Sequence, residues 1–205
     1  MTQDAVTSQQ RVHYDDWMVH TLKPQIDRDL RTLSDREHTF IAGSSMGGLM
    51  SLYAVAQYNS VFGRAAALSP SVWTNVDKLE QLIRRTKIRQ NTVIYMDYGS
   101  VELEQRPKIR RDFERIAAAF FQKKVLLEAR IIPGGTHCEA SWERQIPFFM
   151  KHFCTRNKEM EVQYRKEYSP ALGRDMECKI YGHKGRPVLF IPCQDGRFLI
   201  SKISR

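Results

Sequence analysis

Short apolar segments alternate with longer segments of helical periodicity between residues 38 and 153. Apolar segments of this length, bounded by Gly, Pro or polar residues, are typical of strands that are buried on both faces. The strand candidates are 38–43, 64–71, 91–99 and 125–135, and the helix candidates are 47–58, 76–86, 105–124 and 139–153. Strands and helices in this order predict an α/β fold with a mostly parallel sheet flanked by helices.

The segments on either side of this block differ from it. Residues 14–33 place apolar side chains at helical spacing, and we expect Pro24 to bend that helix. Residues 160–168 and 175–182 alternate apolar and polar side chains, as half-buried antiparallel strands do. Residues 186–196 read as a buried strand that runs into a Gly-containing loop. We therefore expect an antiparallel, β-rich C-terminal tail after the α/β block.

Length and composition narrow the class of protein. A chain of 205 residues can bury one sizeable core, and 42% hydrophobic with 27% charged residues is ordinary for a soluble globular protein. No apolar run reaches the length of a membrane span. The first ten residues lack the basic start and apolar middle of a signal peptide. These features predict a cytoplasmic protein without a membrane partner.

The net charge of +9 raises the question of a nucleic-acid site, and the four cysteines raise that of disulfides or a metal site. The basic residues are spread among acids and helix-spaced apolar residues, whereas a nucleic-acid footprint needs a concentrated patch. We expect solvated helix faces and no nucleic-acid partner. Cys138, Cys154, Cys178 and Cys193 show no CxxC and no paired spacing. Reduced structural thiols, without a metal site, are the expected reading.

Residues 43–47 read Gly-Ser-Ser-Met-Gly, which fits G-x-S-x-G between a predicted strand and a predicted helix. In that context the motif lifts a serine hydroxyl clear of the sheet at a helix N-terminus, so Ser45 is the candidate nucleophile. The backbone N–H of Met46 would favour an oxyanion formed when Ser45 attacks a carbonyl. The alternative is a glycine-rich turn of a nucleotide-binding fold, which the motif alone does not exclude.

A serine hydroxyl needs a base, which in the order Ser…acid…His must come late in the chain. Among the histidines, His137 lies in the loop that follows the last strand of the block, where Gly134 and Gly135 let the chain bend back over the sheet. Two carboxylates could orient this imidazole. Glu102 is expected in the loop after residue 99, and Asp97 is expected at the end of the strand. We favour Glu102 and keep Asp97 as the alternative acid.

Four sequence blocks in this order resemble the esterase family of α/β-hydrolases, namely "IAGSSMGGLMSLY", "FGRAAALSPSVW", "IYMDYGSVE" and "PGGTHCEASW". The family includes feruloyl esterases, siderophore esterases, S-formylglutathione hydrolases and mycolyltransferases, and the resemblance covers roughly residues 10–155. It implies that Ser45, Glu102 and His137 form a catalytic triad. Trp142 matches a tryptophan that commonly follows the histidine and packs the closing helix. The resemblance implies no cofactor.

The chain departs from the family pattern before the nucleophile strand and after residue 157. A complete member has several earlier strands, one of which leads into the loop that supplies a second oxyanion N–H. Residues 160–205 resemble the opening strands of another member. The expected organisation is therefore residues 1–157 as the C-terminal half of an esterase domain and residues 158–205 as the N-terminal strands of a second esterase-like domain, together a partial α/β-hydrolase fold.

The resemblance also predicts how the tail docks. In the family the strand before the oxyanion loop lies beside the nucleophile strand, so residues 188–191 are expected to pair in parallel with residues 40–42. Gln194 would then approach Ser45 as the second oxyanion donor. Association with a second copy of the chain, as a homodimer, is the other way to cover the open sheet edge.

The expected function is hydrolysis of carboxylic esters through an acyl-enzyme on Ser45, weakened by the missing strands. The expected partner is a small-molecule ester substrate. Two alternatives remain open from the sequence. One is a catalytically inactive fragment that only binds or dimerises, and the other is an acyltransferase of the same fold.

Overall fold

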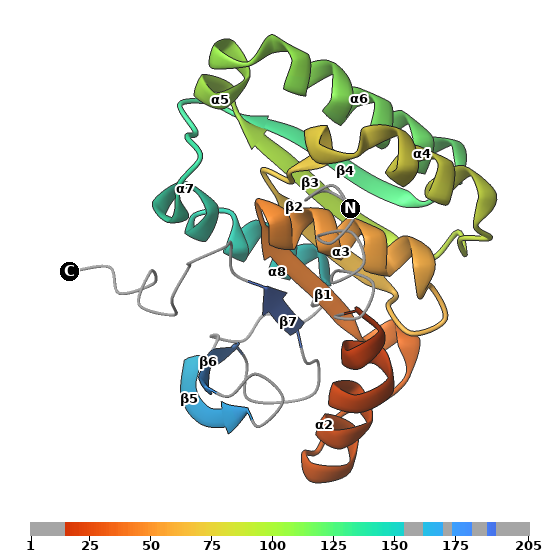
Figure 1. Ribbon diagram of the computed structural model, residues 1–205, viewed down its shortest axis with the longest axis vertical. Coiled ribbons are helices and arrows are strands. Elements are labelled where there is room, and N and C mark those ends of the chain that lie inside the picture. The colour runs from red at the N-terminus through yellow and green to blue at the C-terminus, as the bar shows by residue number, and fades with distance from the viewer. Residues whose placement is uncertain (1–14, 154–161, 170–173, 182–187, 192–205) are drawn as a thin grey trace, which may run out of the picture.

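The computed structural model describes residues 15–153, 162–169, 174–181 and 188–191 (Figure 1). A central sheet holds the chain together, with helices packed on both of its faces. Its strands are β1 (Phe40–Ser44), β2 (Arg64–Leu68), β3 (Val93–Gly99), β4 (Leu126–Ile132) and β7 (Val188–Ile191). They lie in the order β4-β3-β2-β1-β7, and every neighbouring pair is parallel. The α/β architecture predicted from the sequence is confirmed.

The two faces of the sheet bury different side chains because successive residues of a strand point in opposite directions. On one face, Ile41, Ala65 and Ile94 belong to the larger apolar cluster. This face carries α3 (Met46–Gln57), α4 (Val76–Arg85) and α6 (Pro107–Gln122). On the other face, Phe40 and Tyr95 pack with aromatic side chains of α8 (Ile146–Phe153). The core is thus two layers of apolar side chains separated by the sheet.

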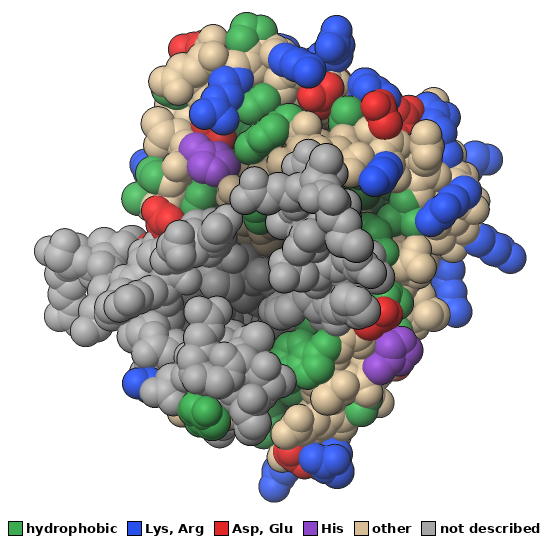
Figure 2. Space-filling view, in the orientation of Figure 1, with side chains coloured by type: hydrophobic (Ala, Val, Ile, Leu, Met, Phe, Trp, Pro, Cys, Tyr) green, Lys and Arg blue, Asp and Glu red, His purple; other side chains and the backbone are tan. Residues whose placement is uncertain are grey.

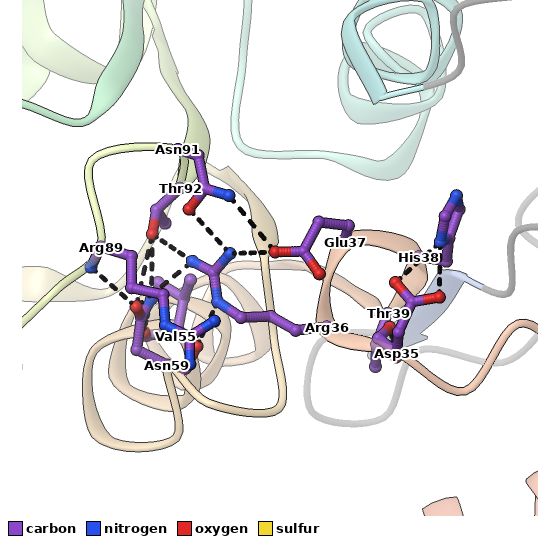
Figure 3. A network of polar contacts seen from close by, with 10 residues as sticks. All are labelled: Asp35, Arg36, Glu37, His38, Thr39, Val55, Asn59, Arg89, Asn91 and Thr92. Carbon is purple, nitrogen blue, oxygen red and sulfur yellow. Dashed lines mark hydrogen bonds and ion pairs between the residues drawn. The ribbon is translucent and has the colours of Figure 1, made fainter.

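A buried arginine fixes the end of the sheet where the strands begin (Figure 3). Arg36 lies in η2 (Arg36–His38) and is 5% exposed. Its guanidinium donates to the Asn59 carbonyl and side-chain oxygens, to Thr92 Oγ1 at 2.6 Å and to Asn91 Oδ1 at 3.0 Å. Glu37 accepts a further bond at 3.1 Å. Arg36 therefore links the segment before β1 to the loops that precede β2 and β3.

Among the described residues, the helices α4 and α6 together carry seven Lys and Arg side chains. Figure 2 shows Lys and Arg side chains over the part of the molecule formed by α4 and α6, with acidic side chains among them. Glu80 accepts from both Arg84 and Arg115, and Asp77 accepts from Arg115 at 2.8 Å. Within the described residues, no helix is both long enough and apolar enough to cross a bilayer.

Two predicted helices are interrupted, each at a proline. The N-terminal helix contains a π-helical turn, η1 (Met18–Leu22), followed by α2 (Lys23–Asp29), and it ends at Asp29, not Leu33. Pro24 has no N–H to continue the α-helical pattern, and the N–H of Lys23 donates to the carbonyl of Met18 instead. The closing helix is split into α7 (Glu139–Glu143) and α8, because Pro147 cannot donate to the carbonyl of residue 143.

The C-terminal tail contributes to two sheets. The strands β5 (Val162–Ser169) and β6 (Arg174–Tyr181) form an antiparallel pair, and β7 joins the main sheet beside β1. In the register of the β1–β7 pair, Phe40 is opposite Val188 and Gly43 is opposite Ile191. The predicted parallel pairing of these two segments is confirmed.

Candidate active site

Ser45 lies on the turn between β1 and α3, at the end of the sheet where the strands finish. Its φ of 54° and ψ of −117° are unusual for a residue with a side chain. The Ser45 N–H donates to the Leu68 carbonyl at 2.8 Å. A Cβ on Gly48 would lie 3.2 Å from the Gly43 carbonyl oxygen and 3.1 Å from Pro70 Cα, so the turn packs closely against β1 and β2. This is the strand–turn–helix geometry that G-x-S-x-G predicts.

His137 lies in the loop between β4 and α7, and its two ring nitrogens face different partners. Nε2 is 3.0 Å from Ser45 Oγ, and Nδ1 is 2.6 Å from Glu102 Oε2. The ring contacts Trp142 edge-to-face, with centroids 4.9 Å apart, and Trp73 lies 6.4 Å away in the same manner. The His137 side chain is 40% exposed, which leaves the Ser45 end of the ring open to solvent.

Glu102 is buried in the first turn of α5 (Ser100–Gln105), not in a loop as the sequence suggested. Its Oε1 accepts from Ser69 Oγ at 2.6 Å and from the Gly99 N–H at 3.0 Å. The bond from Gly99 closes a capping box, in which a side chain at the third helical position satisfies the N-cap N–H. The short helix thereby presents the second oxygen, Oε2, to His137.

Asp97 has other partners. It lies near the end of β3 and is 2% exposed; Tyr95 donates to its Oδ2 at 2.8 Å and the Ser69 N–H lies 3.3 Å from its Oδ1. Burial raises the pKa of this carboxyl to about 7, and the nearby charge of Glu102 acts in the same direction. Of the two carboxylates considered from the sequence, the structure places Glu102 at hydrogen-bonding distance from His137.

Of the two candidate oxyanion donors, Met46 lies within the described residues and Gln194 does not. Met46 is the first residue of α3, so its N–H has no acceptor within its own helix and lies next to Ser45.

Two polar neighbours were not found by sequence reasoning. Ser71 Oγ is 3.3 Å from Ser45 Oγ, and Ser69 bonds to Glu102. Both belong to the "LSPSVW" block, in which Ser69 directly follows β2. Their position just after a strand of the sheet was the sequence signal that could have indicated a role at the site. Within the described part of the chain, no group of three or more His, Cys, Asp or Glu side chains is arranged to hold a metal.

A carboxylate, an imidazole and a hydroxyl in hydrogen-bonded series can move a proton away from the hydroxyl. When Nδ1–H donates to the carboxylate, Nε2 is left with its lone pair toward the serine, and the imidazolium formed on proton transfer is stabilised. The helix N-terminus beside the serine favours negative charge. The arrangement is thus suited to nucleophilic attack by a serine on a carbonyl carbon.

Comparisons with known proteins identify the family and the fold of the chain. The esterase family model, described as "Putative esterase", matches residues 2–153. The uncharacterized protein YbbA of Bacillus subtilis (strain 168) is 26% identical over 100 residues, which are 48% of this chain and 39% of that protein. The enterobactin esterase FES of Shigella flexneri has a TM-score of 0.59 at 20% identity and is matched over 71% of this chain and 41% of its own.

A ferulic acid esterase has a TM-score of 0.57 at 15% identity, over 69% of this chain and 61% of its own. The chain therefore spans less than two thirds of the length of each of these three proteins. The structural likenesses show an α/β-hydrolase-like fold. Because the family model matches most of the sequence, the chain belongs to this esterase family.

Proposed function

We propose that this protein hydrolyses small-molecule carboxylic esters, with Ser45 as nucleophile, His137 as general base and acid, and Glu102 as the residue that orients His137. One observation carries the proposal: His137 lies between the other two, 3.0 Å from Ser45 Oγ and 2.6 Å from Glu102 Oε2. Membership of the esterase family and the names of the two similar solved structures support an ester as the substrate.

The proposed reaction has two half-reactions. Ser45 Oγ attacks the ester carbonyl carbon while its proton passes to His137 Nε2, and a tetrahedral intermediate forms. The intermediate collapses, the bond to the alcohol oxygen breaks, and the alcohol leaves with the proton from Nε2. Water then attacks the acyl-enzyme, again giving its proton to Nε2, and Ser45 recovers that proton as the acid is released. Glu102 accepts from Nδ1–H throughout.

The intermediate carries a negative oxygen that needs donors. We assign one donor to the backbone N–H of Met46, at the N-terminus of α3. The second donor is proposed to come from the residues after β7, Gln194 among them. The parallel pairing of β7 with β1 supports this assignment, because parallel strands end at the same edge of a sheet and Ser45 directly follows β1.

A fluorophosphonate probe tests the nucleophile. The probe should label the full chain at Ser45, and Ser45→Ala should abolish labelling and lower hydrolysis of a p-nitrophenyl ester by more than about 10³-fold. Ser44→Ala is the matched control, since it removes the neighbouring serine hydroxyl of the same motif and should leave labelling in place. Equal labelling of Ser45→Ala and the wild-type chain would contradict the proposal.

A further inference from the structure

Ser69 combines an unusual backbone with a buried hydroxyl. It directly follows β2, is 1% exposed and has a φ of 43°. This left-handed region favours glycine, because a Cβ there crowds the backbone. Glycine would satisfy the backbone, so what serine adds at this position is its hydroxyl.

The Ser69 hydroxyl has two strong partners. It accepts from Trp142 Nε1 at 2.9 Å and donates to Glu102 Oε1 at 2.6 Å. Its backbone N–H donates to the Asp97 carbonyl at 3.0 Å. Ser69 therefore connects the end of β2 with β3, with α5, which carries Glu102, and with α7, which follows His137.

These contacts determine how the carboxylate of Glu102 can turn. Oε1 accepts from the Ser69 hydroxyl and from the Gly99 N–H, while Oε2 lies 2.6 Å from His137 Nδ1. Rotating the Glu102 carboxylate away from these partners would break both bonds to Oε1 inside a buried site, where unpaired polar groups are costly. We propose that Ser69 is a positioning residue, which acts through Glu102 to hold the tautomer and orientation of His137; this rests on the proposed esterase function.

Two substitutions separate the hydroxyl from the stability of the fold. Ser69→Ala removes the hydroxyl and keeps a Cβ at positive φ, whereas Ser69→Gly removes the hydroxyl and relieves the backbone. We expect Ser69→Gly to unfold at no lower urea concentration than Ser69→Ala. Both variants should be labelled by the fluorophosphonate at least about tenfold more slowly than the wild type, the lower limit expected for a hydrogen bond to a charged group. For p-nitrophenyl ester hydrolysis, kcat should fall and KM should change little.

Ser51→Ala is the matched control. Its hydroxyl is also buried but donates to the Gly47 carbonyl within α3, so the labelling rate should stay near that of the wild type. Wild-type labelling rates in either Ser69 variant would overturn the proposal. A labelling rate that recovers in Ser69→Gly in proportion to the stability of that variant would also overturn the proposal, because the effect would then come from folding.

Proton NMR gives a readout that does not need activity. The His137 Nδ1 proton shared with Glu102 should give a far-downfield resonance in the wild type, and this resonance should shift upfield or disappear in both Ser69 variants. If the wild type is not labelled at Ser45, the esterase proposal fails, and the resonance alone decides the role of Ser69. An unchanged resonance in Ser69→Gly and Ser69→Ala would then overturn it.

Discussion

Ser45 and Ser69 both adopt positive φ, and each directly follows one of two neighbouring parallel strands, β1 and β2. Among the described non-glycine residues, Lys124 is the other one in this region. Such conformations persist where the surrounding structure determines them, and they gather at functional sites. Here the Ser45 carbonyl accepts from the Ser71 N–H at 2.9 Å, so the turns after β1 and β2 hold each other.

Asp97 makes the stability of this region depend on pH. Its pKa rises from the ordinary 3.8 to about 7 because the carboxyl is buried. Between these two values the folded chain holds a proton on Asp97 that the unfolded chain releases. Stability must therefore fall as pH rises through this window.

Asp97→Asn tests this link. In the wild type, Asp97 should lower the free energy of unfolding by about 1.4 kcal/mol per pH unit between pH 4.5 and 6.5. The variant should lose that part of the slope, while titrating groups away from Asp97, such as the buried Asp15, contribute equally to both proteins. Urea unfolding across this pH range measures the difference. Parallel pH dependences of the two proteins would show that Asp97 is ionised in the folded chain.

At the scale of the elements, hydrophobic periodicity predicted the strands and the longer helices of the α/β block. The strands β1 to β4 and the helices α3 and α6 follow from apolar runs and helical spacing. The helix α5 was not predicted, because "SVELEQ" is too short to show a period and is fixed by its capping box. The contacts of Ser69 could not be predicted either, since they depend on a backbone angle and on partners 33 and 73 residues away.

The end of β3 and the loop after β4 approach each other without room for a side chain. A Cβ on Gly99 would lie 2.1 Å from the Gly135 carbonyl oxygen, and the Val101 N–H donates to that oxygen at 3.2 Å. Gly99 also donates to Glu102, and Gly135 begins the run that leads to His137. This contact therefore sets the distance between the elements that carry the acid and the histidine.

Gly99→Ala should separate these two segments. We expect a loss of about 2 kcal/mol or more in the free energy of unfolding, as for overpacked sites, and a fall of at least about tenfold in ester hydrolysis. Gly134→Ala is the control. It has a φ of 67° but open space around a Cβ, so it should cost about 1 kcal/mol and leave the site intact. Urea unfolding and the fluorophosphonate labelling rate measure both variants.

For the molecule as a whole, the tail matters because β7 covers one side of β1. With β2 on its other side, β1 is an interior strand, and Ser45 directly follows it. Without β7, the strand that positions the nucleophile would be an edge, with unpaired N–H and C=O groups open to another chain. Sequence periodicity alone could not place β7, because that placement joins residues about 150 positions apart; the family resemblance supplied it.

Replacing both Leu189 and Phe190 by proline tests the pairing in the full chain. Proline cannot donate, so whichever of the two N–H groups faces β1 is removed. We expect amide hydrogen exchange in residues 40–43 to become at least about tenfold faster, because these amides could then be exposed to water without unfolding of the rest of the sheet.

We also expect ester hydrolysis by this variant to fall by about 10² to 10³, the cost of losing one oxyanion donor. Sedimentation should show more self-association than in the wild type, since the bared edge of β1 can pair with a second copy. Unchanged exchange in residues 40–43 would mean that β7 does not stabilise β1 in solution, and the second oxyanion donor would then have to come from elsewhere.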